Sequence, residues 1–310
     1  MDALSEVLRL SRFGAQVMLD ATAREPWCIV MPASESLGRA HLVIEGECRL
    51  RTAAEELTLR AGDFAFLPGG EAHLLGSPAG APATTLASLV RTPVAGELLP
   101  VRLGGNGSTT RVISFSFLCE RHLAAPLLAS LPPIVLVDLS GAAPIEWLVD
   151  SLSLVLSASD APLQGTTATR SRLAEIIFVE ALARYVQSLP PGGKGWLAGL
   201  NDRYVGRALA LVHGRPSESW TVEKLGRQVR LSRSALAERF SDVMGEPIFA
   251  FLTRWRLLLA AEFLLTTART VESVARQAGY ESAGAFSHAF KRVFGKPPSV
   301  WRKKRRNLRA

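Results

Sequence analysis

Two histidines in the first quarter of the chain, His41 and His73, are the residues best suited to metal or ligand chemistry. Each lies in a short apolar run, the first in HLVIEGECRL and the second at the end of GDFAFLPGGEAH. Two imidazoles hold a metal ion only if a third ligand joins them, such as Cys28 or a carboxylate. The alternative, which we favour, is that both rings form hydrogen bonds and line a ligand pocket or a filled barrel.

The three cysteines, Cys28, Cys48 and Cys119, are too few for a disulfide framework and indicate a reducing compartment. Cys28 and Cys48 fall in strand-like apolar runs, which favours buried, unreactive thiols. Cys119 is closely followed by Arg121 and His122. Because nearby cations favour the thiolate, Cys119 is the candidate for a redox-sensing thiol.

The histidines and cysteines supply no catalytic set. Five histidines and three cysteines contain no recognisable nucleophile and base with a third orienting group. We therefore expect no enzymatic activity and no cofactor; a metal at His41 and His73 stays the less favoured alternative. The alternative is a metalloenzyme or redox-sensing domain fused to a second module, and near-stoichiometric iron or zinc in the purified protein would favour the metalloenzyme.

Residues 27–90 predict the β-rich element that positions these groups. The apolar, β-branched runs WCIVMP, AHLVIEGECRLR, EELTL, DFAFLP and ATTLASLVRT alternate with turn residues. Strands this short and frequent indicate an antiparallel barrel or sandwich. Residues 93–110 contain GGNG and predict a mobile loop before the strand RVISFSFL. Because no Lys-Ser/Thr helix start follows, this loop is not a phosphate loop.

From Pro144 onward the apolar residues follow a helical period. Residues 144–158 and 167–188 predict two helices, and LPPGGKG at 189–195 predicts a linker. The second helix is apolar around most of its circumference, so we expect it to be buried on two sides. Its own domain can cover one side, and either the same domain or a second copy in a homodimer can cover the other.

Positive charge is concentrated in the last third of the chain. Residues 201–310 contain 21 Lys and Arg against 9 Asp and Glu, a net charge of +12, whereas residues 1–200 carry −4. Such a segment is typical of a module that binds a polyanion. Charges interrupt the N-terminal MDALSEVLRLSRFGAQ, and no apolar run of about 18 residues follows. We expect a soluble, cytoplasmic protein without membrane contact.

The basic segment contains an internal repeat. TVEKLGRQVRLSRSALAERFSDVMGEP begins at Thr221, and TVESVARQAGYESAGAFSHAFKRVFGKP begins at Thr270 with one inserted residue near Glu281. Each copy predicts a helix-turn-helix, whose second helix begins after Ser232 or Ser282 and ends at a glycine. Side chains at the start of that helix are free to read base edges in a major groove.

Residues 249–265 predict the helix that joins the two copies. FAFLTRWRLLLAAEFLL has no Gly or Pro, and its length as a helix is about 25 Å. The two reading helices would then lie about one DNA turn, roughly 34 Å, apart on one face of the duplex. The tail WRKKRRNLRA is suited to contact with phosphates.

The C-terminal third closely resembles the AraC-type (arabinose-regulator) family of bacterial transcription factors. The resemblance rests on ARQAGYESAGAFSHAFKRVFGKPPSVWRK and on the linker-helix motif RWRLLLAAEFLL. WCIVMP, HLVIEGECRL, LRAGDFAFLPGGEAHLL and PLLASLPPIVLV resemble the cupin-type sensor domain of one subgroup. The implied fold has two domains and is α+β: a cupin-like antiparallel β-barrel followed by helices, then an all-α domain with two helix-turn-helix modules joined by a linker helix.

The same resemblance implies a function. The protein would be a sequence-specific regulator that binds double-stranded DNA, commonly an activator that works with RNA polymerase, with a cupin domain that senses a small-molecule effector. The implied segments are a sensor at 1–140, a helical segment and linker at 141–195 that could dimerise, and a DNA-binding domain at 196–310. In metal-binding cupins His73 would be a ligand, but only His41 remains of the other ligand motif, and Arg39 lies near the place of its Glu.

The family's DNA contacts can be carried over position by position. The base-reading candidates are Ser234, Ala237 and Glu238 in the first recognition helix and Ala283, Gly284, Ala285 and His288 in the second. The phosphate candidates are Ser232, Arg233, Ser282, Lys291, Arg292, Arg302, Lys303 and Lys304. Glu238 can accept a hydrogen bond from cytosine N4, and His288 can donate one to guanine or to phosphate. Because the other reading side chains are small, we expect DNA shape to contribute to specificity.

Two departures from the family pattern fall in the first module. Arg230 stands at a turn position where the family has a small residue, and Gly226 replaces an alanine inside a helix. A glycine in a helix costs about 1 kcal/mol relative to alanine. We therefore expect the second module to be the better formed of the two.

Overall fold

The computed structural model describes residues 2–34, 37–78, 80–89, 98–119, 121–141, 143–157 and 164–307. The chain forms two compact units, and neither is continuous in sequence. The β unit contains Arg12–Cys119 and Leu131–Ser188, and the helical unit contains Met1–Ser11, Glu120–Ser130 and Leu189–Ala310. These units differ from the expected segments 1–140, 141–195 and 196–310, because two short pieces of the first 140 residues belong with the C-terminal third.

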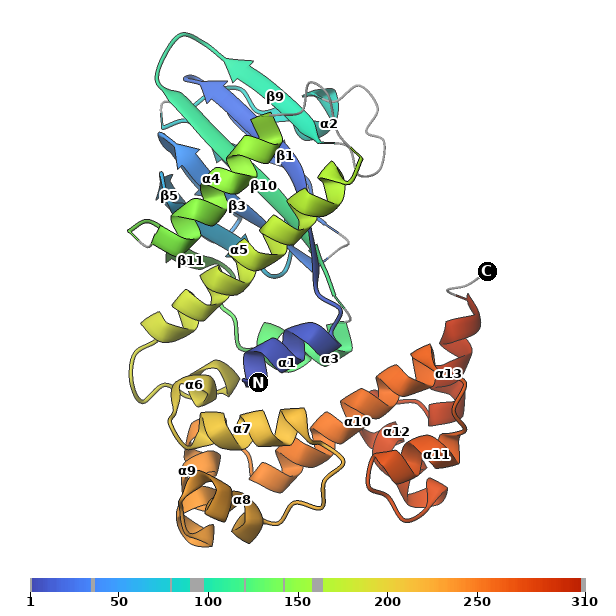
Figure 1. Ribbon diagram of the computed structural model, residues 1–310. Coiled ribbons are helices and arrows are strands. Elements are labelled where there is room, and N and C mark those ends of the chain that lie inside the picture. Colours follow the sequence, from blue (N-terminus) through green and yellow to red (C-terminus); the bar gives the residue numbers. More distant parts are fainter. Residues whose placement is uncertain are drawn as a thin grey trace. The chain divides into compact units, whose positions relative to one another are not determined.

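The β unit is built on two sheets, of which several strands are labelled in Figure 1. The larger sheet has the order β11-β6-β3-β10-β1-β9, and the smaller has the order β5-β4-β7-β2-β8. The strands are β1 Gly14–Arg24, β2 Cys28–Met31, β3 Leu37–Glu45, β4 Glu47–Arg51, β5 Glu56–Arg60, β6 Asp63–Leu67, β7 His73–Gly76, β8 Thr84–Thr85, β9 Leu99–Gly104, β10 Thr109–Leu118 and β11 Val135–Asp138. Among the described residues no ladder joins the two sheets, so the fold is a barrel-like sandwich.

Side-chain alternation in the larger sheet separates two packed faces. His41 on β3 lies opposite Ala65 on β6 and faces the space between the sheets, where an aliphatic core includes Met31, Leu50 and Leu75. The residues between these positions point to the other face. Among them are Phe66, Phe115 and Phe117, which form an aromatic layer. Phe66 and Phe117 of this layer contact Phe178, which lies on the helix Thr166–Ser188.

Two expectations for this region are wrong. The run ATTLASLVRT was expected to be one strand, but only Thr84–Thr85 is β, and Leu86–Leu89 forms the short helix α2. The loop expected at 93–110 contains the strand β9, which pairs in parallel with β1. β8 also pairs in parallel with β2, so the unit is mostly but not wholly antiparallel. The rest of these two runs, residues 90–97, lies outside the described residues.

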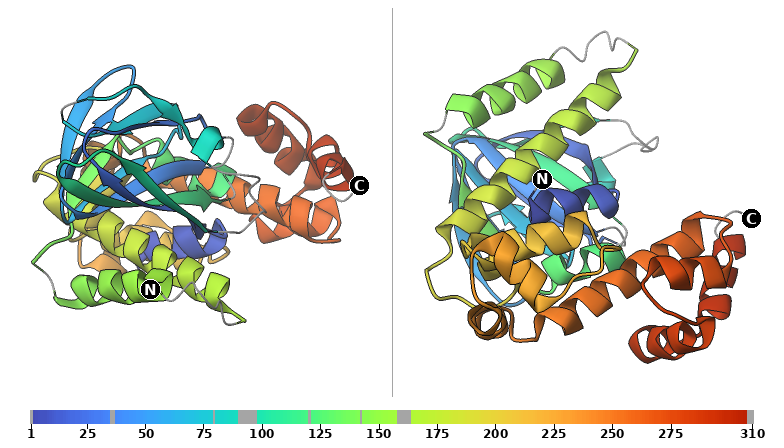
Figure 2. Two further views of the ribbon diagram at one scale, coloured as in Figure 1. Left: turned by 90° about the horizontal axis from the view of Figure 1, so that it is seen from above. Right: turned by 60° about the horizontal axis from the view of Figure 1, so that its bottom comes forward.

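Two helices cover the outer face of the larger sheet. α4 (Ala143–Ser157) and α5 (Thr166–Ser188) match the predicted helices within two residues. They pack against each other, and α5 also packs on β1 and β11; Figure 2 shows them side by side. The sheet and α4 both cover α5, as expected for a helix that is apolar around most of its circumference, although Ile176 stays 45% exposed.

The helical unit gathers elements from three parts of the chain. α1 (Ala3–Leu10) and α3 (Arg121–Leu128) pack on each other, and they also contact α7, α6 and α10 (Figure 1). Its other helices are α6 Trp196–Asn201, α7 Val205–Gly214, α8 Val222–Val229, α9 Arg233–Met244, α10 Ile248–Thr266, α11 Val271–Gln277, α12 Ala283–Phe294 and α13 Pro298–Asn307. In the part of the chain that is described, no helix is long and apolar enough to span a membrane.

α10 has no amphipathic pattern, and its packing explains why it is nevertheless stable. Its first half packs on α9, where Phe251 lies 5.9 Å from Phe240 between ring centroids. Its second half contributes Leu257 and Leu264 to a separate core with Phe286 and Phe290 of α12. One helix therefore belongs to two hydrophobic cores, and each core covers a different part of its surface.

Candidate nucleic-acid interface

The two repeats form two helix-turn-helix modules, which we call module 1 (residues 221–245) and module 2 (residues 270–295). Thr221 and Thr270 cap α8 and α11, and each side chain accepts a hydrogen bond from the backbone N–H three residues later. Ser232 and Ser282 cap α9 and α12 in the same way. These four caps satisfy helix N-termini that would otherwise lack partners.

The turns of the two modules have the same hydrogen bonds but different residues. In each turn the backbone N–H groups of two consecutive residues donate back to the first helix, and the first of these two residues is left-handed. That residue is Arg230 in module 1, with φ of 64°, and Gly279 in module 2, with φ of 81°. A side chain in this conformation is strained by about 1–2 kcal/mol, whereas glycine is not.

The structure explains the other departure in module 1. Gly226 lies on α8, and a Cβ atom there would lie 2.7 Å from the carbonyl oxygen of Leu231. The Leu231 N–H in turn donates to the Gly226 carbonyl at 2.9 Å, so the chain comes back closely over this residue. Glycine therefore fits the tight turn that follows α8, in addition to its cost inside the helix.

The predicted base-reading positions lie on the accessible side of the two recognition helices. On α9, Ser234 and Glu238 are exposed and Ala237 is half-buried. On α12, Gly284, Ala285 and His288 are exposed and Ala283 is half-buried. The opposite sides carry Leu236 and Phe240, or Phe286 and Phe290, which are fully buried. Each helix thus offers one polar or small face, as reading in a groove requires.

The cationic phosphate candidates differ in how far they are already engaged. Arg233 forms an ion pair with Glu223 at 2.9 Å. Lys291, Arg292 and Lys303 are exposed, and no ion pair among the described residues includes them. Arg302 donates a hydrogen bond to the backbone of the 266–270 loop and is half-buried. The side chain of Lys304 lies outside the described residues.

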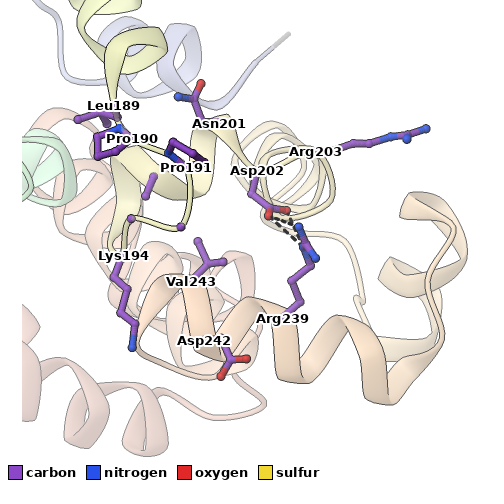
Figure 3. Close-up of a pocket in the computed structure, with 13 residues that line it drawn as sticks. Leu189, Pro190, Pro191, Lys194, Asn201, Asp202, Arg203, Arg239, Asp242 and Val243 are labelled. Carbon is purple, nitrogen blue, oxygen red and sulfur yellow. Dashed lines mark hydrogen bonds and ion pairs between the residues drawn. The ribbon is translucent and has the colours of Figure 1, made fainter.

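An arginine that sequence reasoning missed holds the first recognition helix. Arg239 on α9 forms a forked ion pair with Asp202, with Nη2 to Oδ2 at 2.7 Å, and its guanidinium lies 5.3 Å from the Tyr204 ring. The pair lies in the wall of a cavity of about 610 Å³ between α6, α9 and the residues 189–194, which Figure 3 shows. Asp202 also accepts from the N-terminus of α7, so one carboxylate connects α7 to α9.

A second arginine connects the loop before module 1 with module 2. Arg256 on α10 donates to the carbonyl oxygens of Pro216 and Glu218, in the loop before α8, at 2.7 and 2.8 Å. Its guanidinium also lies beside the turn of module 2, where a Cβ on Gly279 would come within 3.0 Å of Nη1. Arg256 therefore contacts both the loop that precedes module 1 and the turn of module 2, and no sequence pattern indicated this role.

The β unit brings the two predicted histidines together between its sheets. The Nε2 atoms of His41 and His73 lie 2.7 Å apart, His41 Nδ1 lies 2.9 Å from Ser114 Oγ, and His73 Nδ1 lies 2.8 Å from the Glu71 carbonyl oxygen. Because a carbonyl oxygen only accepts, His73 Nδ1 donates. In neutral rings His41 Nε2 then donates to His73 Nε2, and Ser114 donates to His41 Nδ1.

The environment of this pair keeps both rings neutral. Burial holds the pKa of His41 well below its usual range, and the neighbouring His73 and the guanidinium of Arg39 add to this effect. Burial also lowers the pKa of His73, and Arg39 adds to this effect against the opposing hydrogen bond to Glu71. Only two imidazoles converge here, and the described residues contain no group of three His, Cys, Asp or Glu side chains suited to a metal. With a guanidinium beside them, the residues present do not fit a metal ion.

Two of the three cysteines are buried, as the sequence predicted. Cys28 and Cys48 are buried, and burial raises the pKa of Cys28 and raises that of Cys48 to about 12. Both are thiols at neutral pH. Cys119 is half-buried at the end of β10, and its role as a redox-sensing residue stays a prediction.

Two helix-turn-helix modules on a shared helix, in a chain whose other unit is a cupin-like sandwich, define a DNA-binding transcription regulator with a sensor domain. A cupin family model matches residues 2–187, and a helix-turn-helix domain model matches residues 225–304. The chain is 32% identical over 313 residues to an AraC-like transcription regulator of Streptomyces lividans, with 98% of each chain covered. A second such regulator, from Streptomyces antibioticus, is 30% identical over 311 residues, with 98% of this chain and 99% of the relative covered. The chain belongs to the AraC-like family of transcription regulators, which confirms the predicted family and function class.

Solved structures of similar proteins include DNA-bound and ligand-bound forms. The DNA-binding domain of AdpA, crystallised with a target DNA, is 28% identical with a TM-score of 0.33, and covers 35% of this chain and 96% of that domain. ToxT from Vibrio cholerae, crystallised with an unsaturated fatty acid, is 13% identical with a TM-score of 0.37, and 94% of each chain is covered.

Proposed function

We propose that the protein is a cytoplasmic transcription activator, without enzymatic activity, that binds a two-part DNA site and responds to a small-molecule effector in its β unit. Module 1 reads one half-site and module 2 reads the next, in successive major grooves on one face of the duplex. RNA polymerase is the partner through which an activator of this kind acts.

One observation carries this proposal: both recognition helices bury one side in a core to which α10 contributes, and leave the other side free. The free sides carry Ser234 and Glu238 in module 1 and His288 in module 2. Because α10 belongs to both cores, the modules cannot turn independently without disrupting packing. A rigid connection of this type favours a fixed spacing between half-sites.

The β unit supports a homodimer as part of the same proposal. On α4, Ile145, Leu148 and Leu152 are buried. On its other side Trp147 is 67% exposed and Leu154 is 72% exposed, and the two lie seven residues apart on one stripe of the helix. Large apolar side chains on one stripe of an amphipathic helix are suited to pack against the same stripe of a second copy.

The test uses the full chain and a duplex chosen by mapping bound sites across the genome. We expect affinity to fall steeply with salt, with a log–log slope of about −5 for about six phosphate contacts. Inserting about 5 bp between the half-sites turns them to opposite faces and should remove most of the specific affinity. The matched control is the same insertion placed outside both half-sites, which should leave the affinity unchanged.

Two results would contradict the proposal. A salt-independent affinity would show that binding does not depend on phosphates, which is inconsistent with DNA recognition by basic modules. Equal affinity for the spaced and unspaced sites would show that only one module reads DNA.

A further inference from the structure

Arg39 is a buried cation that has no counter-ion among the residues that the structure describes. It lies on β3 two residues before His41, so both side chains point into the space between the sheets. The residue is 7% exposed, and its Nε and Nη1 atoms have no hydrogen-bond partner among the described residues. Burial lowers the pKa of Arg39, yet a guanidinium stays protonated in proteins. A buried, unpaired guanidinium is a strongly unfavourable arrangement unless an anion completes it.

The described neighbours of Arg39 do not supply that anion. His41 and His73 are neutral and already hydrogen-bonded in the chain that runs from Ser114 to the Glu71 carbonyl. No ion pair among the described residues includes Arg39, whereas Arg111 in the same sheet has a forked pair with Asp20 at 2.8 and 2.9 Å. The same sheet thus contains one arginine with a carboxylate and one without.

Exposure rises from the histidines toward one end of the sandwich. His41 and Ser114 are fully buried, and Arg39 lies one step nearer the start of β3. Ser116, which is opposite Arg39 on β10, is half-buried, as is Ser34 just before β3. The guanidinium therefore lies between the fully buried histidines and described neighbours that are partly exposed.

We propose that the β unit binds a carboxylate effector, whose oxygens pair with the guanidinium of Arg39. This inference rests on the proposed function, because it names the chemical class of the effector that the regulator senses. A carboxylate matches the fork of an arginine and replaces its lost hydration. The neutral histidine chain adds no competing charge.

The experiment measures thermal stability of the full chain with sodium acetate, benzoate or octanoate against sodium chloride at equal ionic strength. We expect at least one carboxylate to raise the Tm of the β unit by about 4 °C or more, since a ligand that binds only the folded state stabilises it. Arg39→Met should abolish this shift and, by removing an unpaired charge, leave the ligand-free Tm equal or higher.

Arg111→Met is the matched control. It removes an arginine that already has its carboxylate, so it should lower the ligand-free Tm and keep the carboxylate-induced shift. Arg39→Lys retains the charge without the fork and should weaken carboxylate binding by about tenfold or more. If Arg39→Met fails to fold, the wild-type response and the Arg39→Lys titration still decide the matter.

Measuring how each variant binds duplex DNA distinguishes a failure of the carboxylate site from a failure of the proposed regulatory function. If wild-type protein binds its DNA site but no carboxylate changes its Tm, or if Arg39→Met keeps the shift, the carboxylate site is wrong and the regulator stands. If wild-type protein binds no duplex specifically, the proposed function is wrong, whatever the carboxylates do.

Discussion

Module 1 and module 2 share the same backbone arrangement but differ in the interactions of their charged side chains. Both have a threonine cap, a serine cap and a left-handed turn residue. In module 1 Arg233 and Arg239 are held by the carboxylates of Glu223 and Asp202. In module 2 the end of the recognition helix carries Lys291 and Arg292, where module 1 has Ser241 and Asp242: two cations against none.

This difference shows which features a repeat must keep and which it can change. Caps, turns and buried apolar residues determine whether the module folds, so they recur. The charges on the accessible side can differ without loss of the fold. Module 1 uses its arginines to fix its own helices, whereas module 2 leaves its cations to the solvent. We therefore expect module 2 to provide more of the phosphate contact and module 1 to depend more on internal ion pairs.

Acid should produce the largest difference between the modules. α7 packs on α8 and α9 of module 1, and its His213 is fully buried against Trp196 and Trp255, where burial lowers its pKa to about 3. Because the folded state binds fewer protons than the unfolded state, stability is lost as pH falls below about 6.5. Between about pH 7 and pH 4 we expect a loss of about 3 kcal/mol from this group. Module 2 has no buried histidine among its described residues.

His213→Phe is the matched variant, because it keeps a ring in the same core without a titratable group. Denaturant unfolding at the two pH values should show a smaller loss for this variant than for the wild type. Protection from hydrogen exchange, corrected for intrinsic rates, should fall in α9 before it falls in α12. Equal losses in wild type and variant would show that His213 is not the acid-sensitive group.

The next effect concerns equivalent positions on the recognition helices, Glu238 in module 1 and His288 in module 2. His288→Ala should lower affinity for the preferred site by about 2 kcal/mol and leave random-sequence binding nearly unchanged. Lys291→Ala should weaken all sequences alike and reduce the salt slope by about one unit. Glu238→Ala tests the same position in module 1 and should alter preference only in the other half-site.

Thermal stability distinguishes reading from packing at His288. Its side chain is exposed, so His288→Ala should leave Tm unchanged. A lower Tm with a uniform loss of affinity for every sequence would mean that His288 packs beside Phe286 and Phe290 and reads no base.

The smallest effect is at the turn. Arg230→Gly should stabilise module 1 by about 1 kcal/mol. The substitution removes the strain of a left-handed backbone at a residue with a side chain, and this gain exceeds the cost of the larger conformational entropy of glycine in the unfolded state. Gly279→Ala should destabilise module 2 by about 1 kcal/mol or more, because the new Cβ is strained and approaches Arg256. Unfolding by urea measures both; a destabilising Arg230→Gly would show that the arginine side chain makes a compensating contact.

Much of the helical unit could be predicted from local signals. Repeated Thr and Ser caps, the glycine stops and the unbroken run 249–265 each act within a few residues, and α8 to α12 begin and end close to the predicted places. The β unit was harder, because β9 follows a segment rich in Gly and Pro and is stabilised by its distant parallel partner β1. Propensity carries no information about such a partner.

The candidate sites divide in the same way. His41 and His73 could be named from the sequence as pocket residues, but their direct contact depends on the packing of the two sheets, which brings together residues 32 positions apart on β3 and β7. The sequence shows Arg39 only as a charged residue on the same face of a predicted strand as His41, which is unusual for a buried face. Arg239 and Arg256 gave no signal, because each acts on a segment distant in sequence, Asp202 for one and the 216–218 loop for the other.

The placement of α1 has a consequence for how the protein is made. Its buried side, which includes Ala3, Leu4 and Val7, packs on α7, and α7 starts only at Val205. During synthesis α3 becomes available to the first helix earlier, but α7 becomes available only after most of the chain has left the ribosome. The unit that carries both modules is completed last, so a chain truncated by premature termination before α7 cannot present a finished DNA-binding surface to the genome.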